Sequence, residues 1–470
     1  MHFDTGDTAW VLASSALVLF MTPGLAFFYG GMVRAKNVLG VLMQSYVVIA
    51  VVSLVWVFLA YSLAFGPDAG GAGIIGTLHF AGLAHMGEAV PGYSGASAQS
   101  IPPLVFVIFQ MMFAVITPAL ITGATVDRLK FGAFVAFVVL WSVLVYAPVA
   151  HWVFSPTGWL ARRGAEDFAG GTVVHINAGM AGLAVAAVVG RRRGWPREPM
   201  RPHNVPLVLL GAGILWFGWF GFNAGSALAA NQLSAQAFVN TNTAAAAAML
   251  AWTAVEKLRG GRSTTLGAAS GAVAGLVAIT PACGFVDVVG ALVVGVAAGA
   301  VCALAVSLKF RARLDDSLDV GGVHFVGGVV GALLIGVFGT HAVNGANGLV
   351  YGGGAALLGH QALAVAAVSA YSFGASFLIA KAIDKVVGLR VGEEAELAGL
   401  DLSQHAESGY DLGLALSRGM ATLSGSALGM PAAHSPNRVS RNSSGMRRDP
   451  VPTSRAAPSP GPPPPAARRS

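Results

Sequence analysis

Two histidines lie inside long apolar segments of this chain, where an ionisable side chain is costly and is therefore a candidate for function. His175 follows Asp167 after seven intervening residues, and His324 follows Asp316 after the same number. If the two segments are copies of one unit, the imidazoles approach each other near a pseudo-twofold axis and share a hydrogen bond through their ring nitrogens. Burial disfavours the charged form, so we expect a neutral pair that accepts or relays a proton.

Other interpretations of these residues stay open at this point. Each histidine could instead be a core side chain satisfied by a backbone carbonyl. A metal site is a weaker alternative, because two histidines without an inward Cys, Asp or Glu at ligand spacing form an incomplete set. We therefore expect no metal and no cofactor. Asp167 could attract a cation at an outer mouth or cap the start of a helix, and the two roles are compatible.

Aromatic rings and one hydroxyl form a second candidate site. Phe222 and Ser226 are four residues apart and share a helix face, which suits a cation that also donates hydrogen bonds. An interfacial aromatic belt is the alternative, and we prefer it for Trp152. The other rings near predicted outer ends of apolar segments are Phe109, Phe154 and Trp219.

Membrane-spanning helices must position all of these residues. The chain has 470 residues and is 55% hydrophobic and only 10% charged, whereas soluble domains are roughly 25% charged. We predict an all-α polytopic membrane protein with eleven transmembrane helices, each near the roughly 20 residues that cross a bilayer. The predicted spans cover residues 9–32, 38–65, 102–125, 131–154, 172–190, 204–228, 236–257, 263–281, 286–309, 319–339 and 355–385.

The basic residues are distributed unevenly between the predicted spans. The net charge of +7 would fit a nucleic-acid partner, but the charges lie between and after apolar segments, so no such partner is expected. Connections after even-numbered spans contain only Arg162 and Arg163, and the other inter-span Lys and Arg residues follow odd-numbered spans. The positive-inside rule then predicts an external N-terminus and a cytoplasmic C-terminus.

Spans one to five resemble spans six to ten in sequence. The string ITPA ends span three at 116–119 and span eight at 279–282, and the Asp–His spacing opens spans five and ten. FYGGMVRAKN from Phe28 is matched by FNAGSALAAN from Phe222. Because five crossings reverse the direction of the chain, the copies form an inverted repeat, which is typical of transporters with a site at the repeat interface.

At these residues the chain resembles the ammonium transporter family (Amt/Mep/Rh), and its bacterial Amt branch in particular. The resemblance covers roughly residues 8–412 and rests on DFAGGTVVHINAG at 167–179, GWFGFNAGSA at 218–227, PGLAFFYGG at 23–31, AFVNT at 237–241 and TPACGF at 280–285. It implies an eleven-helix bundle, formed by residues 1–387, with a pore in each protomer of a homotrimer in the inner (plasma) membrane.

The resemblance also implies a role for the polar residues of the pore. His175 and His324 match the paired pore histidines, and Asp167 matches the acid near the outer site. The implied function is ammonium transport. NH4+ loses its proton near the outer constriction, NH3 passes the histidines, and the proton either follows through a relay or returns outside.

The same resemblance assigns the outer site. Phe109 and Phe222 match the stacked rings that block the pore entrance, and Ser226 matches the hydroxyl of the external cation site. Where the family pattern AHxxW ends in Trp, this chain has Phe154. A smaller ring without the indole N–H is expected to recruit the cation less well.

The C-terminal part divides in two. Residues 388–417 resemble the family's ordered cytoplasmic region, which couples protomers and helps to dock a PII-type signal protein. Residues 418–470 are rich in Pro, Ser and Arg and are predicted to be disordered. The alternatives are an ammonium sensor, which usually has a fused signalling domain, and an Rh-like gas channel. A membrane enzyme with a metal on the two histidines is a further rival, but we expect a transporter and not an enzyme.

Overall fold

The structure is a computed structural model, and it describes residues 3–93 and 99–410. Within these ranges all regular elements are helices, which confirms the predicted all-α class. The predicted disordered segment 418–470 lies outside the described residues. So do the last residues of the region 388–417 that was predicted to be ordered.

Each of the eleven predicted spans coincides with a helical segment. The first five spans contain α1 (Thr5–Met32), α2 (Val38–Val55) followed by α3 (Tyr61–Phe65), α4 (Pro103–Thr125), α5 (Phe131–Trp141) followed by α6 (Ala147–Phe154), and α7 (Asn177–Val189). The remaining six contain α8 (Val205–Gly225), α9 (Gln232–Gly260), α10 (Thr265–Ile279), α11 (Val288–Ala305), α13 (Val326–Phe338) and α14 (Ala356–Val387).

Not every helix is equally suited to cross a bilayer. Among the described residues, nine helices are long and apolar enough to do so, and α9 and α10 are not among them. α10 is apolar but has only 15 residues, and α9 is long but less hydrophobic. The chain is therefore a multi-pass membrane protein, and the crossing of the membrane by α9 and α10 stays a prediction.

Short polar side chains fix where several helices begin. The side chain at the N-cap accepts a hydrogen bond from a backbone N–H that would otherwise lack a partner in the first turn. Donor–acceptor distances lie between 2.8 and 3.1 Å. The capping residues are Asp4 for α1, Asn204 for α8, Asn231 for α9, Thr264 for α10 and Asp287 for α11.

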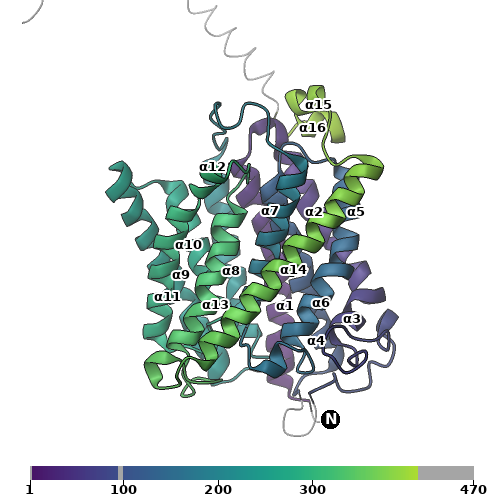
Figure 1. Cartoon of the computed structure of the whole chain (residues 1–470), viewed down its shortest axis with the longest axis vertical. Helices are drawn as coiled ribbons and strands as arrows, with labels where there is room; N and C mark the ends of the chain where they lie inside the picture. The colour runs from purple at the N-terminus through teal and green to yellow at the C-terminus, as the bar shows by residue number, and fades with distance from the viewer. Residues whose placement is uncertain (1–2, 94–98, 411–470) are drawn as a thin grey trace, which may run out of the picture. The chain divides into compact units, whose positions relative to one another are not determined.

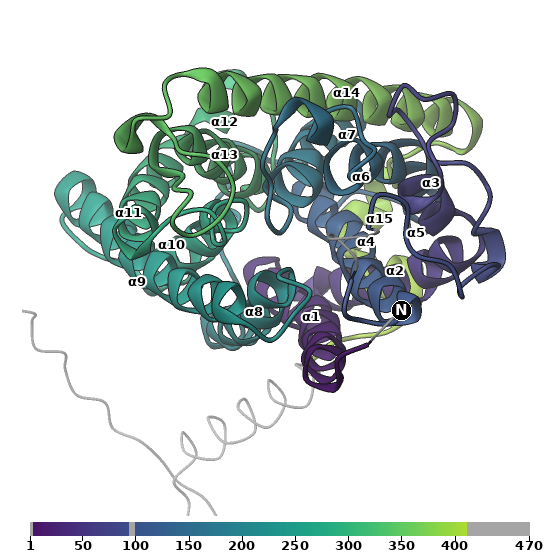
Figure 2. The same ribbon diagram turned by 90° about the horizontal axis from the view of Figure 1, so that it is seen from below.

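The helices form two groups that meet along the bundle. Figure 2 shows α8 to α11 on one side and α2 to α6 on the other, with α1 packed along α8 between them. This contact is close because a Cβ at Gly211 would collide with the backbone of Phe28. Small residues allow such packing in membranes, where lipid is as apolar as the helices themselves.

The longest helix and the C-terminal segment frame this bundle. α14 runs obliquely across it and contacts α5, α7 and α13 (Figure 1). The short helices α15 (Glu393–Ala398) and α16 (Leu400–His405) lie at one end, and the beginning of α1 lies at the other (Figure 1). The two ends of the described chain are thus on opposite sides, as an odd number of crossings requires.

Candidate functional site

A π-helical turn, η7 (Gly171–Ile176), begins the fifth span and carries the first histidine. Asp167 holds this turn in place, because its carboxylate accepts hydrogen bonds from the N–H groups of Gly170 and Gly171 at 2.7 Å and of Thr172 at 2.8 Å. Burial raises the pKa of Asp167, and these bonds together with that of the Thr172 hydroxyl oppose the rise. Asp167 therefore acts as a helix cap that orients His175.

The tenth span repeats this construction. η8 (Gly321–Phe325) is also a π-helical turn and carries His324. The carboxylate of Asp316 accepts from the N–H of Val320 at 3.0 Å and of Gly321 at 2.7 Å. The repeated Asp–His spacing of the sequence thus corresponds to one local structure made twice, with the acid as cap and the histidine two turns further on.

The two histidines meet in the centre of the bundle. Both are buried, their Nδ1 atoms are 3.4 Å apart, and their rings lie 5.4 Å apart with an angle of 19° between the planes. On its other side His175 stacks on Trp219, with ring centroids 5.5 Å apart. Beyond His324, the hydroxyl of Tyr29 lies 3.5 Å from Nε2 and donates to the carbonyl of Leu120 at 3.2 Å.

This chain of contacts is compatible with one arrangement of the ring protons. If the Tyr29 hydroxyl donates to the Leu120 carbonyl, its oxygen can accept from the Nε2–H of His324. The Nδ1 of His324 then carries a lone pair and accepts from the Nδ1–H of His175. That leaves the Nε2 of His175 as an acceptor, and this buried atom has no hydrogen-bond partner within the described residues.

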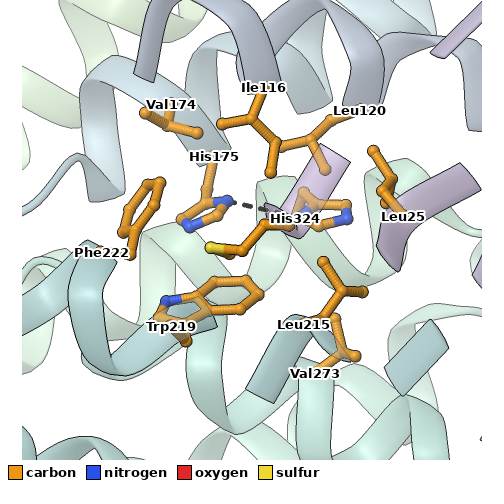
Figure 3. Close-up of a pocket in the computed structure, with 11 residues that line it drawn as sticks. Leu25, Ile116, Leu120, Val174, His175, Leu215, Trp219, Phe222, Val273 and His324 are labelled. Atoms are coloured by element: carbon orange, nitrogen blue, oxygen red, sulfur yellow. Dashed lines mark hydrogen bonds between the residues drawn. The ribbon is translucent and has the colours of Figure 1, made fainter. Parts of the chain in front are cut away.

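A narrow apolar cavity surrounds the histidine pair (Figure 3). Its volume is about 10 Å³, the space of roughly one water-sized molecule. The indole N–H of Trp219 donates to Thr280 at 2.8 Å and is therefore not available to a molecule in the cavity. The polar atoms that the cavity offers are the imidazole nitrogens. The lining residues are Met21, Leu25, Ile116, Leu120, Val174, His175, Leu215, Trp219, Phe222, Val273 and His324.

The pair of stacked rings next to the histidines is not the predicted pair of Phe109 and Phe222, because one ring comes from the next turn of α4. Phe222 lines the cavity, but the ring that packs on it is Phe113, at 4.3 Å between centroids, rather than Phe109. Phe109 packs behind Phe113 at 4.9 Å and approaches Gly225. Phe109 and Phe113 are four residues apart on one face of α4, so the sequence gives the face but not the depth at which each ring lies.

The remaining predicted residues lie around these rings. Phe154 is half-buried at the end of α6 and meets Phe113 edge to face at 6.3 Å. Ser226 is half-buried, and its hydroxyl donates to the carbonyl of Phe222 at 2.8 Å. Phe113 therefore connects the rings of Phe109, Phe154 and Phe222, a role that sequence reasoning missed although the four-residue spacing from Phe109 was available.

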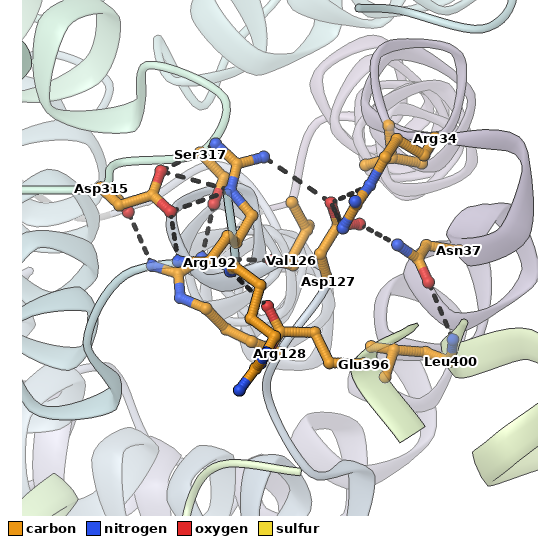
Figure 4. A network of polar contacts seen from close by, with 12 residues as sticks. Arg34, Asn37, Val126, Asp127, Arg128, Arg192, Asp315, Ser317, Glu396 and Leu400 are labelled. Carbon is orange, nitrogen blue, oxygen red and sulfur yellow. Dashed lines mark hydrogen bonds and ion pairs between the residues drawn. The ribbon is translucent and has the colours of Figure 1, made fainter. Parts of the chain in front are cut away.

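A different polar cluster lies where the connections after α4, α7 and α12 (Leu308–Ala312) meet (Figure 4). Arg128 is fully buried and donates to Ser317 Oγ at 2.6 Å and to four carbonyl oxygens, among them that of Asp315 at 2.6 Å. Arg192 forms a bidentate ion pair with Asp315. Burial alone would raise the pKa of Asp315, but hydrogen bonds from Arg192 and the charge of Arg128 hold it below its usual value.

The C-terminal segment joins this cluster. Asp127 pairs with Arg34 at 3.0 Å and accepts from Asn37, whose side-chain oxygen in turn accepts from Leu400 N–H at 2.8 Å. Buried Glu396 pairs with Arg390 at 2.6 Å. It also accepts from the N–H of Arg193 at 2.7 Å. The cluster is therefore built from sequence segments that are far apart, and it fixes α15 and α16 on this end of the bundle.

Fold and site together define an α-helical membrane protein with two repeats, in which a buried histidine pair lines a cavity at the repeat interface. The chain matches the profile of the Ammonium Transporter Family over residues 9–410. It is 53% identical to an ammonium transporter of Mycobacterium bovis over 438 residues, with 88% of this chain and 91% of the relative covered. The chain belongs to the ammonium transporter family.

Other relatives and solved structures agree. An ammonium transporter of Bacillus subtilis is 49% identical, with 86% of this chain and 98% of the relative covered. The crystal structure of Saccharomyces cerevisiae Mep2 is 36% identical with a TM-score of 0.78, and covers 84% of this chain and 89% of its own. A structure titled Sensor Amt Protein is 30% identical with a TM-score of 0.78, and covers 85% and 98%.

Proposed function

We propose that this protein transports ammonium by admitting NH4+ at its outer aromatic site and conducting NH3 past His175 and His324. The observation that carries the proposal is the Nε2 of His175, which has no hydrogen-bond partner among residues 3–93 and 99–410 and lies beside a cavity of about 10 Å³. A buried acceptor without a donor costs free energy. A small N–H donor that enters the cavity removes this cost, and ammonia matches it in size and in chemistry.

The order of steps follows from the positions of the residues. A cation is attracted to aromatic faces and to an acceptor oxygen, which Phe154, Phe222 and Ser226 supply. Phe113 and Phe222 then separate this site from the cavity, so NH4+ gives up its proton before it passes them. The resulting NH3 accepts or donates hydrogen bonds along the histidine pair. The proton either returns outside or crosses by relay through the nitrogens of the pair.

Selectivity follows from the cost of desolvation. Potassium has no proton to lose, so it would have to enter an apolar cavity as an ion, at a cost of many kcal/mol. The caps at Asp167 and Asp316 contribute by holding both imidazoles in place. Asp167 stabilises the first turn of its helix, and its oxygens are used by backbone donors.

The proposal extends to the orientation, assembly and partners of the protein. Arg34, Arg128 and Arg192 gather near Glu396 of α15 (Figure 4), which favours a cytoplasmic C-terminus in the plasma membrane. Assembly as a homotrimer and docking of a PII-type signal protein on residues 388–417 follow from family membership. Residues 1–387 form the transport domain in this proposal, and residues 418–470 a disordered tail.

Two alternatives remain within the family. One similar structure is titled a sensor, so an ammonium sensor that binds without conducting is the first. A gas channel that passes NH3 without ever binding NH4+ is the second. A sensor would pass nothing across the bilayer. A gas channel would pass only neutral NH3, and its flux would not saturate as the NH4+ concentration rises.

The test is ammonium uptake and current in proteoliposomes that contain the purified protein. We expect uptake that saturates with NH4+ and excludes potassium. Replacing His175 and His324 by Ala should change flux or selectivity while the protein still inserts and assembles. Trp216→Phe, a conservative change at a half-buried ring outside the cavity, is the matched control. Uptake and potassium exclusion at the level of the unmodified protein in the double variant would contradict the proposal.

A further inference from the structure

Three potential metal ligands converge on the loop between α3 and α4, away from the histidine cavity. They are His79, His85 and Glu88, and one ligand atom from each lies within 4.8 Å of the others. The Nε2 of His79 is 2.9 Å from one carboxylate oxygen of Glu88, and the Nδ1 of His85 is 3.6 Å from the other. These residues belong neither to the histidine cavity nor to the cluster around Arg128, Arg192 and Asp315.

The backbone of the loop brings the three side chains together. Phe80 anchors it, because its ring is buried and its N–H donates to Ser62 Oγ at 2.8 Å. Leu83 and His85 adopt left-handed conformations, with φ of 55° and 58°, which non-glycine residues seldom do. The chain therefore reverses within a few residues, and Glu88 N–H closes the turn on the His85 carbonyl at 3.0 Å.

We propose that His79, His85 and Glu88 bind a divalent transition-metal ion of the Zn²⁺ type, with water in the fourth position. Imidazole nitrogens and a carboxylate oxygen are ligands that Zn²⁺ accepts, whereas Ca²⁺ and Mg²⁺ prefer oxygen alone. Ligands at about 2.0–2.1 Å from a tetrahedral ion are about 3.4 Å from one another. The separations of 2.9 and 3.6 Å run to different oxygens of Glu88, and one ligand atom from each of the three side chains lies within 4.8 Å of the others, so a small shift of the side chains brings them to this spacing.

Binding requires one local adjustment. The two imidazole rings are stacked, with centroids 4.4 Å apart and 12° between their planes, and a ring nitrogen directs its lone pair within the plane of its ring. One ring must therefore turn about its Cβ–Cγ bond to share the ion. The side chains of His79 and His85 are 34% and 55% exposed, so both have room to turn.

The loop lies at the end of the bundle where the chain begins, because Asp4 N–H donates to the Ser100 carbonyl at 2.8 Å. It also touches the helix that carries Phe154. The indole N–H of Trp152 donates to the Ile74 carbonyl at 2.8 Å. In the proposed orientation the site faces the outside, and a bound ion would brace the loop beside the pore entrance.

The experiment measures metal bound by the full chain in lipid nanodiscs. The protein is stripped with a chelator and dialysed against micromolar ZnCl2, and the bound zinc is counted by mass spectrometry. We expect the unmodified protein to bind one Zn²⁺ per chain more than the variant with both His79→Ala and His85→Ala. Glu88→Gln, which keeps the size of the side chain, should weaken binding roughly tenfold or more. His360→Ala, at a half-buried histidine elsewhere, is the control and should bind as before.

A second measurement identifies the coordination geometry of the bound metal ion. Co²⁺ in place of Zn²⁺ should give the visible absorption of a four-coordinate nitrogen and oxygen site, and the absorption should be lost in the double histidine variant. Equal zinc in the unmodified protein and the double variant would overturn the proposal, because other histidines would then account for all binding. Tighter binding of Ca²⁺ than of Zn²⁺ would overturn it as well.

Discussion

The histidine cavity and the cluster around Arg128, Arg192 and Asp315 both bury polar groups. The cluster pairs these groups with one another, whereas the cavity leaves one of them without a partner in the part of the chain that the structure describes. In the cluster, Arg128 uses its side-chain donors on oxygens of the protein, and Arg192 meets Asp315 in a bidentate pair. In the cavity, Nε2 of His175 has no partner within the described residues.

This difference distinguishes buried polar groups that stabilise the fold from a buried polar group that can bind a ligand. A saturated buried network stabilises one arrangement of the chain and has nothing left to offer a ligand. An acceptor left open in an apolar cavity destabilises the empty state and is available to a small donor. Substitutions should therefore reduce stability in the cluster, but change transport in the cavity with little loss of stability.

The largest effect is expected in the cluster. Asp315→Asn keeps the shape of the side chain but removes the charge of the bidentate partner of Arg192, whose guanidinium then retains only the longer contact of 3.7 Å to Asp127. Removing one partner of a buried ion pair costs about 3–5 kcal/mol. We expect a clear drop in melting temperature of the purified protein. Glu394→Gln, at an exposed acid of the same region, is the control and should melt as the unmodified protein does. An unchanged melting temperature in Asp315→Asn would mean that the cluster is not structural.

The next effect concerns how the C-terminal segment depends on the same cluster. Truncation after residue 387 removes Glu396 and Arg390, and with them contacts to Arg193 and to the carbonyl of Arg191. We expect lower stability, lower uptake and lost capture of a PII-type protein. Truncation after residue 415 keeps these contacts and should leave all three intact. If the longer protein already loses activity, the division between 388–417 and 418–470 is wrong.

A smaller effect is expected at the outer rings. Phe154→Trp restores a larger aromatic face beside Phe113, and a cation–π contact is worth about 0.5–2 kcal/mol. Because Phe154 already offers an aromatic face, only part of this energy is gained, so the ammonium concentration for half-maximal uptake should fall modestly, with the melting temperature nearly unchanged. Phe58→Trp, at a ring that is 65% exposed, serves as the control. A half-saturation value that stays the same or rises would count against a cation site at this position.

The smallest effect concerns Glu166, next to the Asp167 cap. Burial raises its pKa from 4.5 to about 7, although it accepts from Ala346 N–H at 2.8 Å. Because the pKa of this acid is raised on folding, its contribution to stability is complete below pH 4.5 and is lost as the pH rises through about 7. The loop around Gly345 and Ala346 should therefore open more readily at higher pH.

Hydrogen exchange measures this opening. After correction for intrinsic rates, protection of the loop should be greater at about pH 6 than at about pH 8. Glu166→Gln stays neutral and keeps an acceptor for Ala346, so its protection should not change across this range. The same pH dependence in both proteins would assign the effect to another group.

Local patterns in the sequence determined most of the architecture. Apolar runs predicted the helical segments, because every backbone group must be paired inside a bilayer. The repeated Asp–His spacing predicted matching histidines, and the structure makes the same capped turn at Gly171–Ile176 and Gly321–Phe325. Family-specific strings supplied the identity, which the comparisons confirmed.

Tertiary structure alone decided which groups meet and at what depth. The four-residue spacing places Phe109 and Phe113 on one face of α4, but only the packed bundle shows that Phe113 contacts Phe222. The hydroxyl of Tyr29 lies 3.5 Å from Nε2 of His324, although the two residues are 295 positions apart in sequence. Periodicity describes one helix at a time. The rotation and depth of one helix against another depend on side chains from both, which no single segment of sequence contains.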